Sequence, residues 1–152
     1  MGAAYFYHLT RRPMEETLAM LLGKARQAGW RVIVRGRDQN RMEWLDEKLW
    51  LGSDEGFLPH GLAGGPHDDL QPILLTTGTA SSAEAQCIMS VDGADVTADE
   101  IDRLDRVCVL FDGNDAAALQ TARAQWKALK DAGASAQYWS EEGGKWAKKA
   151  ET

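Results

Sequence analysis

The sequence predicts an α/β fold, a Rossmann-like three-layer sandwich with a mostly parallel central sheet. Short apolar segments typical of strands alternate with amphipathic helical segments along all 152 residues, which indicates parallel strands joined by right-handed helical crossovers. The segment 107–111 (VCVLF) is apolar throughout, as a central strand covered on both faces is. A chain of this length fits one domain, so residues 1–152 are expected to form a single unit.

The first three elements are expected to be a strand, a helix and a strand. Residues 5–9 (YFYHL) form the first strand. Pro13 followed by Glu15 predicts a helix start, because proline suits the first turn and a carboxylate suits the helix dipole there. Gly29 is placed to end this helix as a C-terminal cap, and the second strand is predicted at 31–35.

The middle of the chain continues the alternation. A second helix runs from its cap at Asp38 to Trp50. Strands follow at 73–76 and 87–91. Thr97, with a glutamate three residues later, predicts a capping box for a short helix. The apolar strand at 107–111 then leads into a helix of about 18 residues, and a last strand is predicted at 136–139.

Composition and charge limit the classes of partner. The net charge of −6 argues against a broad nucleic-acid-binding surface, which depends on many Lys and Arg contacts. From residue 120 onward, six basic residues stand against four acidic ones, so an anionic partner is expected to meet that part of the chain. Cys87 and Cys108 lie in apolar segments, as buried thiols of a reducing compartment do. Without a leader or an apolar run of about 18 residues, a cytoplasmic location is expected.

The usual signatures of catalysis do not occur. The turns after the predicted strands carry no glycine motif for a dinucleotide or a phosphate, and no nucleophile elbow is found. Asp112 and Asp115 are explained most simply as caps of the next helix. Neither a metal nor a cofactor is predicted, because no standard ligand spacing links the three histidines, which are His8, His60 and His67.

A small Rossmann-like enzyme or nucleotide-binding domain is the alternative. In this fold, ligands usually bind at the carboxyl ends of the strands. Asp38, Asp92 and Asp112 follow predicted strands and would lie at that edge.

The long helix after residue 112 carries an uneven distribution of side chains. One arc is basic and aromatic, and it holds Leu119, Arg123, Trp126, Lys127 and Lys130. The opposite arc is small and apolar and is expected to face the sheet; it holds Ala118, Thr121, Ala128, Leu129 and Ala132. Gln125 fits this buried arc poorly. Trp126 either faces outward, as a site for an acidic peptide with an apolar group, or packs on a C-terminal segment around Tyr138, Trp139 or Trp146.

The loop after the second helix is unusually apolar. It contains Phe57, Leu58, Pro59 and His60, directly after Trp50. Large apolar side chains in a loop either fold back onto the core or contact another molecule. Both alternatives are open from the residues alone.

The segments LDEKLW (45–50) and FLPHGLAG (57–64) are similar to the chi subunit family of the bacterial DNA polymerase III holoenzyme. The resemblance covers nearly the whole chain in order, although residues 77–106 match only in pattern. It implies a replication accessory protein without catalytic activity. Such a protein would link the clamp loader to single-stranded DNA-binding protein and meet DNA only indirectly.

The resemblance also implies two protein-binding sites. The helix ARAQWKALKDAG (122–133) looks like the element that holds the acidic C-terminal tail of single-stranded DNA-binding protein, which ends in Pro-Phe. Leu119 stands where some relatives carry a basic residue. The implied tail-binding residues are Arg123, Trp126, Lys127, Lys130 and Tyr138. The implied contacts to the psi subunit, or to another clamp-loader component, are Trp50, Phe57, Leu58, Pro59 and His60.

Overall fold

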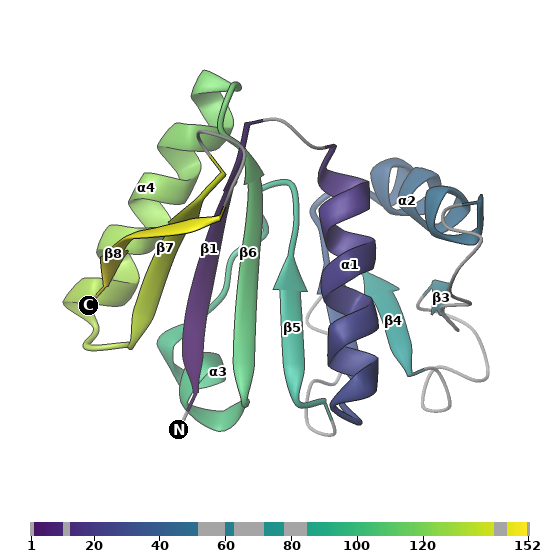
Figure 1. The fold of residues 1–152 in the computed structure, drawn as a ribbon, viewed down its shortest axis with the longest axis horizontal. Helices are drawn as coiled ribbons and strands as arrows, with labels where there is room; N and C mark the ends of the chain where they lie inside the picture. The colour runs from purple at the N-terminus through teal and green to yellow at the C-terminus, as the bar shows by residue number, and fades with distance from the viewer. Residues whose placement is uncertain are drawn as a thin grey trace.

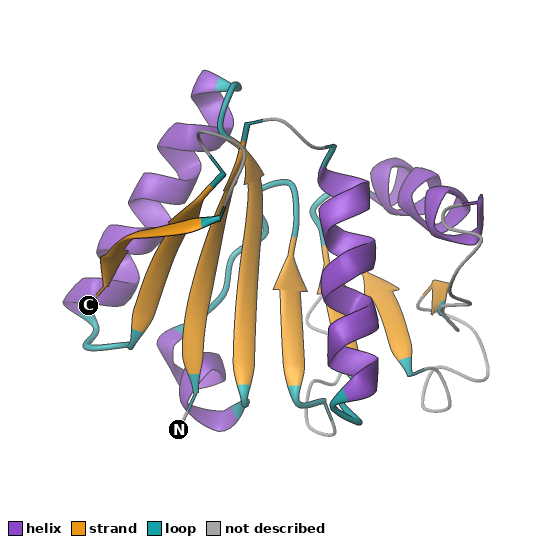
Figure 2. Ribbon diagram, in the orientation of Figure 1, coloured by secondary structure: helices purple, strands orange, loops and turns teal. Residues whose placement is uncertain are grey.

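The computed structural model describes residues 2–10, 13–51, 60–62, 72–77, 85–141 and 146–151, with Trp50 and Leu51 described by their backbone alone. These residues form helices and one eight-stranded sheet (Figures 1 and 2). The helices are α1 (Met14–Gln27), α2 (Gln39–Leu51), α3 (Ala98–Arg103) and α4 (Ala116–Asp131). The strands are β1 (Ala3–Leu9), β2 (Val32–Arg35), β3 (Gly61–Leu62), β4 (Ile73–Thr76), β5 (Cys87–Ser90), β6 (Arg106–Asp112), β7 (Ala136–Ser140) and β8 (Ala147–Glu151).

The sheet is mostly parallel, as predicted. Its strand order is β3-β4-β2-β5-β6-β1-β7-β8, and every neighbouring pair is parallel except β7 and β8. The central strands are apolar because both of their faces are covered. The predicted strand at 107–111 is the core of β6, between β5 and β1.

Helices cover the sheet on both faces and make the predicted three-layer sandwich (Figure 1). Leu22 of α1 and Leu45 of α2 pack into one core. Ile101 of α3 and Leu129 of α4 pack with Phe6 into a second core on the opposite face. Both cysteines are buried free thiols on neighbouring strands, in agreement with their apolar context.

Local sequence signals set several helix ends where they were predicted. Gly29 follows α1 with φ +80°, a conformation that glycine adopts without a steric penalty. Thr97 caps α3 through the complete capping box with Glu100. Asp115 caps α4 by accepting hydrogen bonds from the amides of Ala117 and Ala118.

The buried face of α4 differs from the prediction. Ala122, Gln125 and Leu129 are its buried residues, whereas Ala128 and Ala132 are exposed. At 100° per residue the buried arc is rotated by about 50° toward Trp126. A hydrogen bond of Gln125 accounts for part of the difference, because its side-chain nitrogen donates to the carbonyl oxygen of Ala94 at 3.0 Å.

Two strands were not predicted. The first is β3, which is only two residues long and lies at one edge of the sheet. The second is β8, which pairs antiparallel with β7 at the other edge (Figure 2). All five residues of β8 (AKKAE) are exposed, so they lack the apolar periodicity on which strand prediction depends.

Candidate functional site

A pocket of about 470 Å³ lies where α4 meets β7 and β8. Its lining residues are His8, Arg123, Trp126, Tyr138, Ser140, Lys149 and Ala150. Three of the five residues implied by the resemblance therefore come together here. The other two, Lys127 and Lys130, are exposed on α4 but do not line the pocket.

The apolar wall of the pocket is formed by a cluster of aromatic rings. Trp126 is half-buried and meets Phe6 edge to face, with ring centroids 5.4 Å apart. It meets Tyr138 in the same way at 5.8 Å. Trp126 thus packs on Tyr138 of the neighbouring strand, as one of the two alternatives predicted, and it also lines the pocket. Its role in binding a peptide stays a prediction. Trp146, by contrast, contacts Tyr7 on the opposite face of the sheet.

A hydrogen bond fixes the orientation of the Tyr138 phenol. Its hydroxyl group lies 2.8 Å from Nδ1 of His8 on β1, the strand next to β7. His8 also packs on the ring of Phe111, with ring centroids 5.2 Å apart. A Cβ atom added at Gly113 would collide with the imidazole of His8, so glycine at this position leaves room for the ring. The sequence pattern did not identify His8 as a pocket residue, because only the pairing of β1 with β7 brings it there.

Two cationic side chains from different elements line the pocket together with these rings. Arg123 belongs to α4 and Lys149 to β8. Within the described residues, neither side chain has a hydrogen bond or an ion pair. Leu119 is half-buried at the edge of the second core and does not line the pocket. The pocket therefore combines an apolar wall with cations available to an anionic group.

Most of the predicted psi contacts lie outside the described residues. Phe57, Leu58 and Pro59 fall in the segment 52–59, and Trp50 is described by its backbone alone. The docking prediction for these four residues stays a prediction.

His60, the fifth predicted psi contact, is buried, and its docking role stays a prediction as well. Its side chain is buried, with Nε2 3.1 Å from the carbonyl oxygen of Asp46 and 3.2 Å from its carboxylate. These contacts hold His60, which follows the apolar loop in the sequence, against α2. Trp44 on the same helix is half-buried, and the guanidinium of Arg41 covers its ring at 4.0 Å.

A second cavity of about 640 Å³ lies at the carboxyl ends of β1 and β6. These strands are parallel neighbours, and the helices that follow them, α1 and α4, cover opposite faces (Figure 1). This is the place where ligands usually bind in such a sheet. Asp92 and Asp112 line the cavity, whereas Asp38 does not.

Three carboxylates of this cavity, those of Asp92, Asp112 and Asp115, have structural roles. Asp92 pairs with Arg41 at 3.1 Å. Asp112 accepts a hydrogen bond from the amide of Asn114, and Asp115 caps α4. Among the residues that the structure describes, no group of three His, Cys, Asp or Glu side chains is placed to hold a metal ion. His67, one of the histidines considered above, lies outside the described residues.

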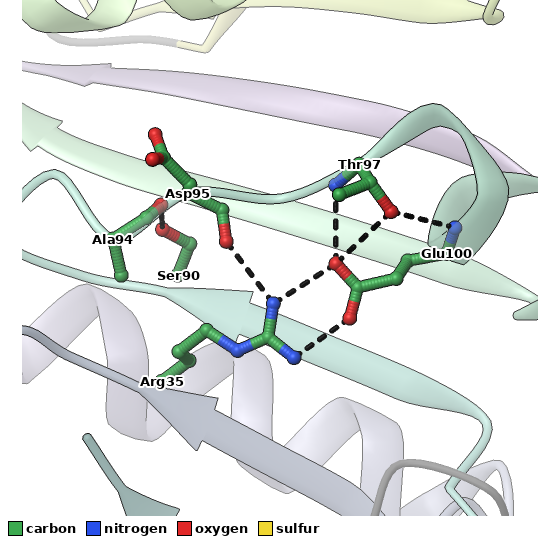
Figure 3. A network of polar contacts seen from close by, with 6 residues as sticks. All are labelled: Arg35, Ser90, Ala94, Asp95, Thr97 and Glu100. Carbon is green, nitrogen blue, oxygen red and sulfur yellow. Dashed lines mark hydrogen bonds and ion pairs between the residues drawn. The ribbon is translucent and has the colours of Figure 1, made fainter. Parts of the chain in front are cut away.

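A buried ion pair holds the connection between β5 and α3 against β2 (Figure 3). The guanidinium of Arg35 donates to both carboxylate oxygens of Glu100, at 2.9 and 2.7 Å, and to the carbonyl oxygen of Asp95 at 3.0 Å. Burial opposes ionisation of Glu100, but Arg35 and Thr97 outweigh it and hold the pKa of this carboxyl below its usual value. The sequence predicted the capping role of Glu100 but not this pair, because Arg35 and Glu100 are far apart in the chain.

Comparison with known proteins identifies the family. The family model of the DNA polymerase III chi subunit, HolC, matches residues 1–137. A probable DNA polymerase III subunit chi from Rickettsia prowazekii (strain Madrid E) is 23% identical over 90 residues. That alignment spans 59% of this chain and about half (54%) of the relative. In the described part of the chain, no helix is long and apolar enough to cross a membrane. Because the family match covers most of its length, the chain belongs to the DNA polymerase III chi subunit family.

Proposed function

We propose that this protein is a non-catalytic replication accessory subunit that binds the acidic C-terminal tail of single-stranded DNA-binding protein and so links it to the clamp loader. It would act in the cytoplasm and meet DNA only indirectly. The observation that carries this proposal is the pocket beside α4, where half-buried aromatic rings lie next to cations without partners among the described residues. Membership of the chi family supports the place of the protein in replication.

The chemistry of the pocket fits such a tail. An apolar terminal side chain would pack against Trp126 and Tyr138, whose rings line the pocket. Carboxylates of the tail would pair with Arg123, whose fork of donors suits a carboxylate. Exposed Lys127 and Lys130 would attract the tail from farther away without lining the pocket.

A fluorescence-anisotropy titration tests this site. The probe is a labelled peptide that copies the C-terminal tail of the organism's single-stranded DNA-binding protein, and a second peptide lacks the final Phe. Trp126→Ala should cost about 2 kcal/mol of binding free energy, or about 30-fold in affinity, as a central aromatic contact does. Arg123→Ala should cost about 1 kcal/mol, because an exposed ion pair is screened by water.

The matched control is Arg103→Ala, which removes an exposed arginine from α3, away from the pocket. It should leave the affinity for the tail peptide unchanged. Saturable binding that disappears with the final Phe supports the proposal. If neither peptide binds to the wild-type protein, the proposed tail-binding function is wrong.

The link to the clamp loader is proposed to use the apolar loop with Phe57, Leu58 and Pro59, together with Trp50. Its support is the sequence, since large apolar side chains in a loop often contact a partner. Size-exclusion chromatography of this protein with purified clamp-loader subunits tests the link. The double variant Phe57→Ala/Leu58→Ala should abolish co-elution and still bind the tail peptide, whereas unchanged co-elution would exclude this loop as the contact.

A further inference from the structure

The strand β8 contains an irregularity in its pairing with β7. Tyr138 pairs with Ala150, and the next residue of β7, Trp139, pairs with Lys148. Lys149 therefore has no partner in β7 and is the extra residue of a β-bulge. Bulges often redirect a side chain and are frequent beside functional sites.

The bulge places the two lysines of β8 in different surroundings. Lys148 forms an ion pair with Glu151 at 2.8 Å, and both side chains are exposed. Lys149 lines the pocket together with Ala150, the partner of Tyr138. A regular strand would alternate these residues between the two faces, whereas the bulge lets Lys149 and Ala150 line the same pocket.

Lys149 has the properties of a binding residue rather than of a structural one. Within the described residues, no hydrogen bond or ion pair of this ammonium group is found. It comes from β8, at the edge of the sheet, whereas Arg123 comes from the helix on one face. The aromatic wall of Trp126 and Tyr138 belongs to the same pocket.

We propose that Lys149 is an anion-binding residue of this pocket, so that an acidic peptide is held between α4 and β8 with carboxylates on both Arg123 and Lys149. This inference rests on the tail-binding function proposed above. It specifies the ligand further, because two cations on different elements select a peptide with at least two carboxylates beside its apolar group. A peptide with one carboxylate would satisfy only one of them.

The test compares Lys149→Met with Lys148→Met in the anisotropy titration. The two variants remove the same charge from neighbouring positions of one strand, so nonspecific electrostatic attraction falls equally in both. Lys149→Met should weaken binding of the tail peptide roughly fivefold, and Lys148→Met by less than about twofold. Lys149→Arg should restore binding, and the dependence of affinity on salt should be shallower in Lys149→Met than in Lys148→Met.

A second peptide, with its acidic side chains replaced by amides, completes a double-mutant cycle. The penalty of Lys149→Met should disappear with this peptide if the ammonium group acts on a carboxylate. Equal affinities of Lys149→Met and Lys148→Met for the acidic peptide would overturn the role of Lys149 while leaving the tail-binding function intact. Absence of binding by the wild-type protein would overturn both.

Discussion

Replacing Glu100 by glutamine should remove about 3 kcal/mol from the free energy of unfolding, because breaking a buried ion pair leaves an uncompensated charge. The side chains of Arg35 and Glu100 are only 8% and 11% exposed, so water replaces little of the lost interaction. Glutamine is nearly isosteric and is accepted at this position of a capping box. The substitution therefore tests the charge with little disturbance of the cap of α3.

The magnitude follows from the geometry of the pair. Two charge-assisted hydrogen bonds join Arg35 to Glu100, and each is worth about 1.5 to 3 kcal/mol in a folded protein. The glutamine amide keeps one oxygen that can accept a hydrogen bond from Arg35. Its NH₂ group cannot accept one, because it is a donor like the guanidinium. Arg35 keeps its bond to the carbonyl oxygen of Asp95, which limits the loss. A loss of about 3 kcal/mol corresponds to roughly 6 to 12 °C in the melting temperature of a chain of this size.

Urea denaturation at several pH values measures the effect. Because the pKa of Glu100 is lowered in the folded protein, its stabilising contribution is fully present above the ordinary value of about 4.5 and is lost as the pH falls through the lower folded value. The difference between wild type and Glu100→Gln should therefore be constant at neutral pH and shrink in acid. A variant within about 0.5 kcal/mol of wild type at pH 7 would refute this reasoning, since buried pairs cost far more to break.

Three further predictions concern the two cavities and the loop. Gly113→Ala should weaken binding of the tail peptide, because its new methyl group displaces His8 and with it the hydrogen bond to Tyr138; a matched change at Gly23, which meets no neighbour, should not alter the affinity. His60→Ala should lower the free energy of unfolding by about 1 to 3 kcal/mol, since it removes a buried side chain together with its two contacts to Asp46. In chemical denaturation, a stability equal to wild type would place His60 at the surface instead. Nucleotides with Mg²⁺ should not raise the melting temperature in a thermal-shift assay, because Asp92, Asp112 and Asp115 of the larger cavity already serve an ion pair, a turn and a helix cap; a rise that scales with ligand would favour the nucleotide-binding alternative.

Elements with local signals were predictable from the sequence. Gly29 ends α1 because its positive φ is a property of glycine itself, and the capping box at Thr97 lies within four consecutive residues. The apolar segment of β6 marks burial on both faces without any knowledge of its neighbours.

Features that depend on tertiary contacts were missed. The burial of Gln125 depends on its hydrogen bond to the carbonyl oxygen of Ala94. This residue lies in the connection between β5 and α3, far from Gln125 in the sequence. The strand β8 forms because its backbone pairs with β7, although its exposed and charged side chains show no apolar pattern. Lys149 joined the candidate site only through this pairing.

The ion pair between Arg35 and Glu100 also affects the register that β2 adopts against its neighbouring strands. Val32, Ile33 and Val34 are all apolar, and β2 is buried on both faces between β4 and β5. Such a strand would bury its apolar side chains almost equally well after a shift in register, because both of its faces are apolar. A slip by one residue would move the guanidinium by about 3.3 Å and turn it to the other side of the sheet. The ion pair thus favours one register of β2 over alternatives that would bury a similar amount of apolar surface.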